Sequence, residues 1–223
     1  MTSERRTDGA GTSTPRRDVA AHWITSLLLQ QFLVWPLVLV PVSALAHIDA
    51  AGAGAGGFLS GLRHPITGLD HVVAMVAVGL WGAQLGPPAL WLLPVVFPLV
   101  MAVGGVAGVV GVALPGIGLG IAFSAILLGG MVATEAKPPL WIAMLMVGAF
   151  AIFHGHAHGT AMPAFGVPIL FASGFVVATG LLHVLGITIG LLVRWSAGSL
   201  VVRGAGVTVV LVGGYFVASY LKN

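Results

Sequence analysis

The chain of 223 residues contains no cysteine and few charged residues, and both absences restrict what it can be. Without cysteine it forms no disulfide, iron–sulfur cluster or thiolate metal site, so a bound metal must use histidine, carboxylate, methionine or backbone oxygen. Charged residues make up 7% of the chain, whereas soluble domains devote about a quarter of their residues to them. Together with a hydrophobic fraction of 58% and a mean hydropathy of +1.06, this predicts a membrane protein.

The sequence lacks the signals that mark several classes of function. The net charge of +3 comes from dispersed basic residues without a basic stripe, so we expect no nucleic-acid partner. No glycine-rich P-loop is present, which argues against direct use of ATP. Ser60 and Ser124 lie in ordinary glycine-rich contexts rather than in a nucleophile elbow, which argues against an intramembrane hydrolase. We therefore predict that the protein is not an enzyme.

The N-terminal region divides into two segments. Residues 1–18 hold seven of the charged residues and show no apolar periodicity, so they are predicted to be a disordered tail. Residues 19–46 contain an apolar run that ends in Ala44-x-Ala46, a pattern that signal peptidase cuts. Cleavage after Ala46 would make His47 the mature N-terminus. The alternative is an uncleaved first transmembrane helix.

Residues 47–223 are predicted to form an all-α, polytopic membrane domain. Each of its apolar blocks is long enough to cross a bilayer, and alternating β-barrel patterns are missing from the sequence. Glycine pairs such as Gly104 and Gly108 predict close contacts between helices. Residues 47–63 are rich in glycine and are expected to be an exposed arm. The six expected spans are 65–85, 89–113, 116–133, 139–161, 167–193 and 201–221.

The basic residues predict an orientation. With the arginine-rich tail in the cytoplasm, the positive-inside rule also places Lys137, Arg194 and Arg203 on the cytoplasmic side. We therefore expect a multi-pass protein of a bacterial-type inner (plasma) membrane, with the mature N-terminus exterior.

The first candidate site is the stretch from His64 to His71, at the start of the first mature span. An aspartate at the centre of a membrane helix costs about 2.5–3.5 kcal/mol, so Asp70 is expected to be paired, hydrated or ligated. On one helix running from Pro65, His64 and His71 would share a face, with Asp70 about a third of a turn away. The three groups could then converge on one ion. The alternative is that Asp70 only hydrogen-bonds a neighbouring histidine or the backbone.

A second cluster, His154, His156 and His158, lies at the end of the fourth mature span. On a regular helix His154 and His158 share a face and His156 points elsewhere, although the interleaved glycines weaken the helix. The predicted topology places this cluster and Asp70 in the same outer half of the membrane, where we expect them to face one another. Solvated histidines of an exterior loop are the alternative.

Two further histidines extend this hypothesis. His183, in the fifth span, lies deeper and is predicted to be an inner relay, or else a hydrogen-bonded packing residue. His47 would offer an amine and an imidazole after signal cleavage, or else be a solvated terminus without a role. Imidazole and carboxylate without sulfur suit Ni²⁺, Co²⁺ or Zn²⁺.

These motifs resemble a known family. The run from His64 to Gly86 (His-Pro-x-x-Gly-x-Asp-His, continued to Leu-Trp-Gly-Ala-Gln-Leu-Gly) is similar to the first-helix signature of the HupE/UreJ family. Phe153–Gly159 and Ala178–Gly186 resemble two further segments of that family. The resemblance implies a nickel permease with six transmembrane helices after signal removal, which supplies hydrogenase or urease maturation. The residues it carries over are His64, Asp70, His71, His154 and His158.

We therefore predict a membrane permease that imports a divalent transition metal, Ni²⁺ first, with Co²⁺ or Zn²⁺ as alternatives. The ion is the cargo, and no tightly bound cofactor is expected. The expected partners are the metal ion and the lipid bilayer, and the sequence leaves the oligomeric state open. The alternative function is a haem-binding membrane cytochrome, with histidines of facing helices as axial ligands.

Overall fold

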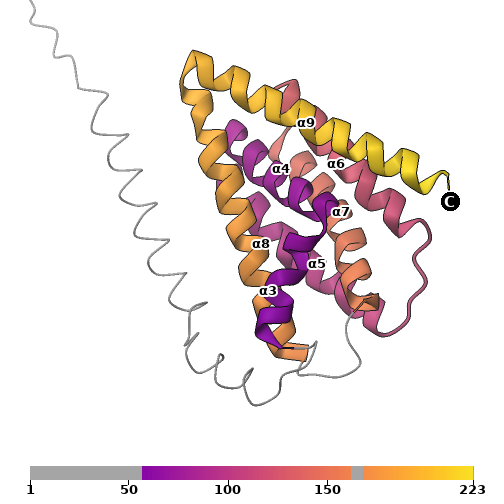
Figure 1. The fold of residues 1–223 in the computed structure, drawn as a ribbon. Helices are drawn as coiled ribbons and strands as arrows, with labels where there is room; N and C mark the ends of the chain where they lie inside the picture. The colour runs from indigo at the N-terminus through magenta and orange to yellow at the C-terminus, as the bar shows by residue number, and fades with distance from the viewer. Residues whose placement is uncertain (1–56, 162–167, 223) are drawn as a thin grey trace, which may run out of the picture. The chain divides into compact units, whose positions relative to one another are not determined.

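The computed structural model describes residues 57–161 and 168–222, and these form a bundle of helices (Figure 1). The predicted tail, the signal-like segment and His47 lie outside the described residues. The chain order is α3 (Phe58–Thr67), α4 (Leu69–Leu85), α5 (Ala89–Val109), α6 (Ile117–Ala133), α7 (Leu140–Thr160), α8 (Pro168–Gly190), a short 3₁₀ segment η1 (Leu191–Arg194) and α9 (Ser196–Tyr220).

The helices confirm an all-α membrane bundle. In the described ranges five helices, α5 to α9, are individually long and apolar enough to span a bilayer, and α3 with α4 passes as a sixth, bent span. Large aliphatic side chains point outward, since Leu99, Val103, Leu145 and Leu211 are all more than 60% exposed. Water would disfavour such a surface, whereas lipid tails match it.

The first predicted span is wrong in one respect, because it is not a continuous helix from Pro65. α3 ends at Thr67, Gly68 adopts an extended backbone, and α4 begins at Leu69 at an angle of 86° to α3. The Thr67 hydroxyl donates a hydrogen bond to the carbonyl of His64 (2.8 Å), which satisfies an acceptor at the broken helix end. His64 and His71 therefore lie on different helices.

The expectation of an exposed arm over residues 47–63 is also wrong from Phe58 onward. These residues form most of α3, which packs along α8. Phe58 and Gly61 are buried there, and a Cβ atom at Gly61 would collide with the backbone carbonyl of Phe171. The apolar face of α3 and this close approach outweigh the flexibility that glycine suggests in the sequence.

α4 is the central helix of the bundle. Every residue from Ala77 to Gln84 is buried, and the helix contacts α5, α6, α8 and α9. A helix that is apolar on all sides requires neighbours on all sides. At its C-terminal end, the Gln84 side-chain amide donates to the carbonyl of Val132 (2.9 Å), and the Trp81 indole donates to Ala136 (2.9 Å). These bonds hold α4 against the end of α6.

Glycines set the spacing of the remaining helix pairs. α5 packs on α7, and Figure 1 shows α6 beside α9. A Cβ at Gly104 would collide with the carbonyl of Ile152, and one at Gly155 with that of Met101. The predicted role of Gly104 in a close helix contact is confirmed. The backbones of α5 and α7 are therefore almost in contact, which fixes the position of α7 along α5.

We expect Gly104→Ala to lower the free energy of unfolding by about 1–3 kcal/mol, because the Ile152 carbonyl occupies the space that the added methyl needs. Gly130→Ala is the matched control, since open space surrounds that helical position. It should be neutral or slightly stabilising. Thermal unfolding of the detergent-purified variants measures both effects, and equal melting temperatures would contradict the close contact.

Candidate metal centre

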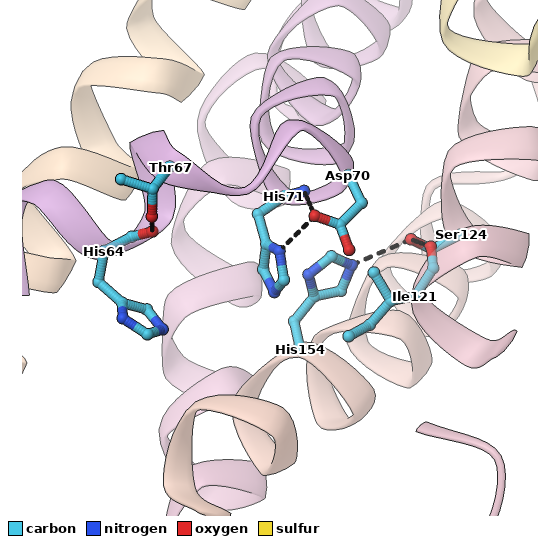
Figure 2. A network of polar contacts seen from close by, with 7 residues as sticks. All are labelled: His64, Thr67, Asp70, His71, Ile121, Ser124 and His154. Atoms are coloured by element: carbon cyan, nitrogen blue, oxygen red, sulfur yellow. Dashed lines mark hydrogen bonds and ion pairs between the residues drawn. The ribbon is translucent and has the colours of Figure 1, made fainter. Parts of the chain in front are cut away.

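Four imidazoles from three helices come together at the bend between α3 and α4. His64 belongs to α3, His71 to the first turn of α4, and His154 and His158 to the last turns of α7. Their ring centroids follow one another: His64 to His158 at 5.0 Å, His158 to His71 at 4.6 Å, and His71 to His154 at 5.1 Å. Figure 2 shows His64, His71 and His154 of this group.

The ring spacing suits a shared ion, although the donor atoms are not yet aimed at one point. With metal–nitrogen distances of about 2.0–2.1 Å, two imidazoles on one ion have their centroids roughly 4.5–5 Å apart. The observed separations of 4.6–5.1 Å are close to this range. Over residues 57–161 and 168–222, no three acidic or histidine side chains are already arranged to hold a metal ion. Binding by three of these groups therefore requires them to move relative to one another.

His71 is oriented by its neighbour Asp70. The His71 ring lies 2.8 Å from Asp70 through Nδ1, and Asp70 Oδ1 also accepts from the backbone N–H of His71 at 3.0 Å (Figure 2). A carboxylate only accepts, so Nδ1 carries the proton and Nε2 presents its lone pair. Nε2 is buried and has no hydrogen-bond partner in the described part of the chain. Asp70 is thus paired, as the cost of a charge in a membrane requires.

Gly68 makes room for this pair. A Cβ atom at position 68 would lie 2.9 Å from Asp70 Oδ1 and 2.9 Å from His71 Nδ1, the two atoms that the hydrogen bond joins. Any larger residue would press on both groups. Gly68 therefore has two roles. It separates α3 from α4, and its lack of a side chain leaves space for the hydrogen bond between Asp70 and His71.

His154 is held from α6. It is fully buried, and its Nε2 lies 3.0 Å from the hydroxyl oxygen of Ser124. Its other nitrogen, Nδ1, is buried and finds no hydrogen-bond partner among the described residues. His154 therefore has one ring nitrogen anchored and one open, as His71 has.

His158 occupies the middle of the imidazole group and borders an apolar cavity of about 520 Å³ between α5, α7 and α8. Phe175 packs against its ring at 4.3 Å, and Met101 and Phe171 continue the cavity wall. His158 Nε2 is buried, again without a partner in the described ranges. Because this cavity is lined almost entirely by apolar side chains, a hydrated dication would not enter the site through it.

His183 lies deeper in the bundle and is separated from the group by one aromatic ring. The Phe97 ring centroid is 5.5 Å from that of His154 and 5.5 Å from that of His183. Gly79, nine residues beyond Asp70 in α4, packs against the His183 carbonyl, which places the backbone of His183 about 13 Å further along α4 than Asp70. Both ring nitrogens of His183 are buried without a partner in the described residues.

His156 does not join the group. The structure keeps α7 helical through the histidine cluster, and the His156 ring donates from Nε2 to the carbonyl of Val112 at 2.6 Å. On this regular helix His156 points away from His154 and His158, so the structure does not bring this predicted metal ligand into the group. It anchors the segment that follows α5.

Two neighbours of the site were not predicted as site residues. In the sequence Ser124 stands in an ordinary glycine-rich context, and Phe97 lies within an apolar run. Nothing in the local sequence distinguishes them, because a small residue in α6 and an aromatic in α5 are ordinary packing residues of a membrane helix. Only the helix contacts place them beside His154.

The described chain is thus a multi-pass membrane bundle with a histidine and aspartate cluster between its helices. The family model described as HupE / UreJ protein matches residues 35–216. Protein HupE of Rhizobium leguminosarum bv. viciae is 46% identical over 174 residues, which cover 78% of this chain and 90% of that protein. The chain belongs to the HupE/UreJ family, as the sequence motifs predicted. No solved structure matches it.

We expect Asp70→Asn to weaken the binding of Ni²⁺ about 10–100-fold, because the charge that orients and polarises His71 is lost. Glu135→Gln makes the same chemical change at a carboxylate that instead accepts from the Ser199 hydroxyl, and it should leave affinity unchanged. Isothermal titration calorimetry of the purified proteins measures both. Wild-type affinity in Asp70→Asn would remove Asp70 from the site.

Proposed function

We propose that the protein is a permease that imports a divalent transition metal, Ni²⁺ first, into the cytoplasm. One observation carries the proposal: His71, His154 and His158 lie side by side within the membrane bundle, and each has a buried nitrogen without a partner in the described residues. Buried polar atoms normally find hydrogen-bond partners. Three that do not, with the His71 ring 5.1 Å from that of His154 and 4.6 Å from that of His158, support a binding site.

The chemistry of the cluster favours a borderline dication. Neutral imidazoles bind Ni²⁺, Co²⁺ and Zn²⁺, and the chain offers no thiolate that would favour Cu⁺. Membership of the HupE/UreJ family supports the broader role of nickel or cobalt transport, or of service to hydrogenase or urease. Among these ions we propose nickel as the main cargo. We propose that it is imported for the maturation of metalloenzymes.

The proposed path runs from the imidazole group to His183. The ion exchanges water for His71, His154 and His158 at the exterior side, where the positive-inside rule places the start of α4. It then passes Phe97, whose ring separates His154 from His183, as the helices shift. Binding at each position must stay weak enough for release to the next.

Haem binding is the less favoured function. Two axial imidazoles lie on opposite sides of a haem iron, so their ring centroids are roughly 6.4 Å apart with a porphyrin between them. The imidazoles here are in direct contact at 4.6–5.1 Å, which leaves no room for a porphyrin. A Soret band in the visible spectrum of the purified protein would reverse this preference.

We expect His158→Gln to reduce accumulation of radioactive nickel in cells by at least about tenfold, because glutamine removes the central imidazole of the group. His156→Gln is the matched control on the same helix, since glutamine can still donate to the Val112 carbonyl. Uptake is compared per amount of folded protein in the membrane. Equal uptake by the two variants and the wild type would refute the site assignment.

We also expect His183→Gln to separate binding from transport. Nickel affinity of the purified protein should stay within about twofold of wild type, because the Phe97 ring separates His183 from the imidazole group and His183 would not touch an ion held there. Nickel uptake should fall about tenfold or more, since the ion lacks its inner ligand. Unchanged uptake would take His183 out of the path and leave it a packing residue.

A further inference from the structure

Ser124 of α6 lies between two groups that determine where its proton points. The side chain is fully buried. Its Oγ lies 2.6 Å from the carbonyl oxygen of Ile121, one turn earlier in α6, and 3.0 Å from Nε2 of His154 in α7 (Figure 2). The close packing of α6 on α7 brings these groups together, since a Cβ at Gly120 would meet the Phe153 ring.

The proton positions follow from counting donors. A serine hydroxyl has a single proton, and a carbonyl oxygen can only accept, so the Ser124 proton goes to Ile121. The hydroxyl oxygen is then an acceptor toward His154. Nε2 of His154 must therefore carry the ring proton and donate it to Ser124.

A neutral imidazole with its proton on Nε2 has its lone pair on Nδ1. Nδ1 of His154 is the atom that is buried without a partner in the described chain, and the ring it belongs to contacts that of His71 at 5.1 Å. A metal ligand needs a lone pair at that position. The opposite tautomer would present an N–H and would repel the ion.

We propose that Ser124 is a positioning residue for the metal site: it holds His154 as the Nε2–H tautomer and leaves the lone pair of Nδ1 for the ion. This rests on the proposed function. Ser124 thereby does for His154 what Asp70 does for His71, with a neutral hydroxyl in place of a carboxylate. Second-sphere acceptors of this kind fix the tautomer and orientation of ligating histidines.

The test uses the full-length protein with ¹⁵N-labelled histidine in lipid bilayers, without metal. Solid-state NMR distinguishes protonated from unprotonated ring nitrogens, and a His154→Gln sample assigns the His154 signals by difference. Nickel affinity is measured by calorimetry on the same preparations. Besides the wild type, the variants are Ser124→Ala, which removes the acceptor, and Ser124→Thr, which restores a hydroxyl.

Ser173→Ala is the matched control. Ser173 of α8 donates to the carbonyl of Leu170 at 2.8 Å, the same one-turn bond that Ser124 makes to Ile121, and no histidine bond to it is observed among the described residues. The control therefore removes the same kind of intrahelical hydrogen bond without removing an acceptor from an imidazole.

We expect the wild-type His154 to be protonated at Nε2, with a hydrogen-bonded shift, and unprotonated at Nδ1. Ser124→Ala should lose that shift or show a second tautomer, and should bind nickel about 10–100-fold more weakly. Ser124→Thr should recover both, and Ser173→Ala should match the wild type.

Three results would overturn the proposal: a wild-type His154 protonated at Nδ1, a Ser124→Ala variant with unchanged signals or unchanged nickel affinity, or an equal loss in Ser173→Ala. The first needs only the wild type and the His154→Gln sample that assigns its signals. If the wild type binds no nickel, the proposed permease function fails, while the metal-free His154 signals still show whether Ser124 sets the tautomer.

Discussion

The break at Gly68 is the constraint on which the site depends. By ending α3 and starting α4 at 86°, it lets His64 and His71 approach His158 from two directions rather than from one helix face. The same glycine leaves space for the hydrogen bond between Asp70 and His71. A carboxylate can remain in this apolar bundle because it has a donor there, and that donor, His71, is oriented by it with Nε2 left unpaired among the described residues.

Around this break, glycine contacts decide which imidazoles meet. The close contact of α5 with α7 fixes the position of His154 and His158 along the bundle. The close contact of α4 with α8 does the same for His183. In lipid no hydrophobic force distinguishes one helix pairing from another, so close packing of small residues supplies the specificity. The glycines that hold the bundle together are therefore also the residues that set the geometry of the site.

Much of this arrangement could be predicted from the sequence. Apolar blocks and turns locate the spans, because backbone groups in lipid must be satisfied within helices. Helical periodicity separates His156 from His154 and His158, and the single carboxylate in the spans marks Asp70. The bend could not be predicted, since Pro65 is compatible with a helix and Gly68 alone does not dictate a break. Ser124 and Phe97 could not be predicted either, because both resemble packing residues.

The sequence by itself determined the solvent, the helical class and the donor chemistry. Few charges and long apolar runs leave only a membrane bundle, and the lack of cysteine excludes thiolate and leaves histidine, carboxylate, methionine and backbone oxygen as donors. Only the tertiary structure decided which donors act together and which nitrogen of each ring is free. Those properties depend on atoms contributed by other helices, such as the Ser124 hydroxyl beside His154, and a pattern along one helix does not contain them.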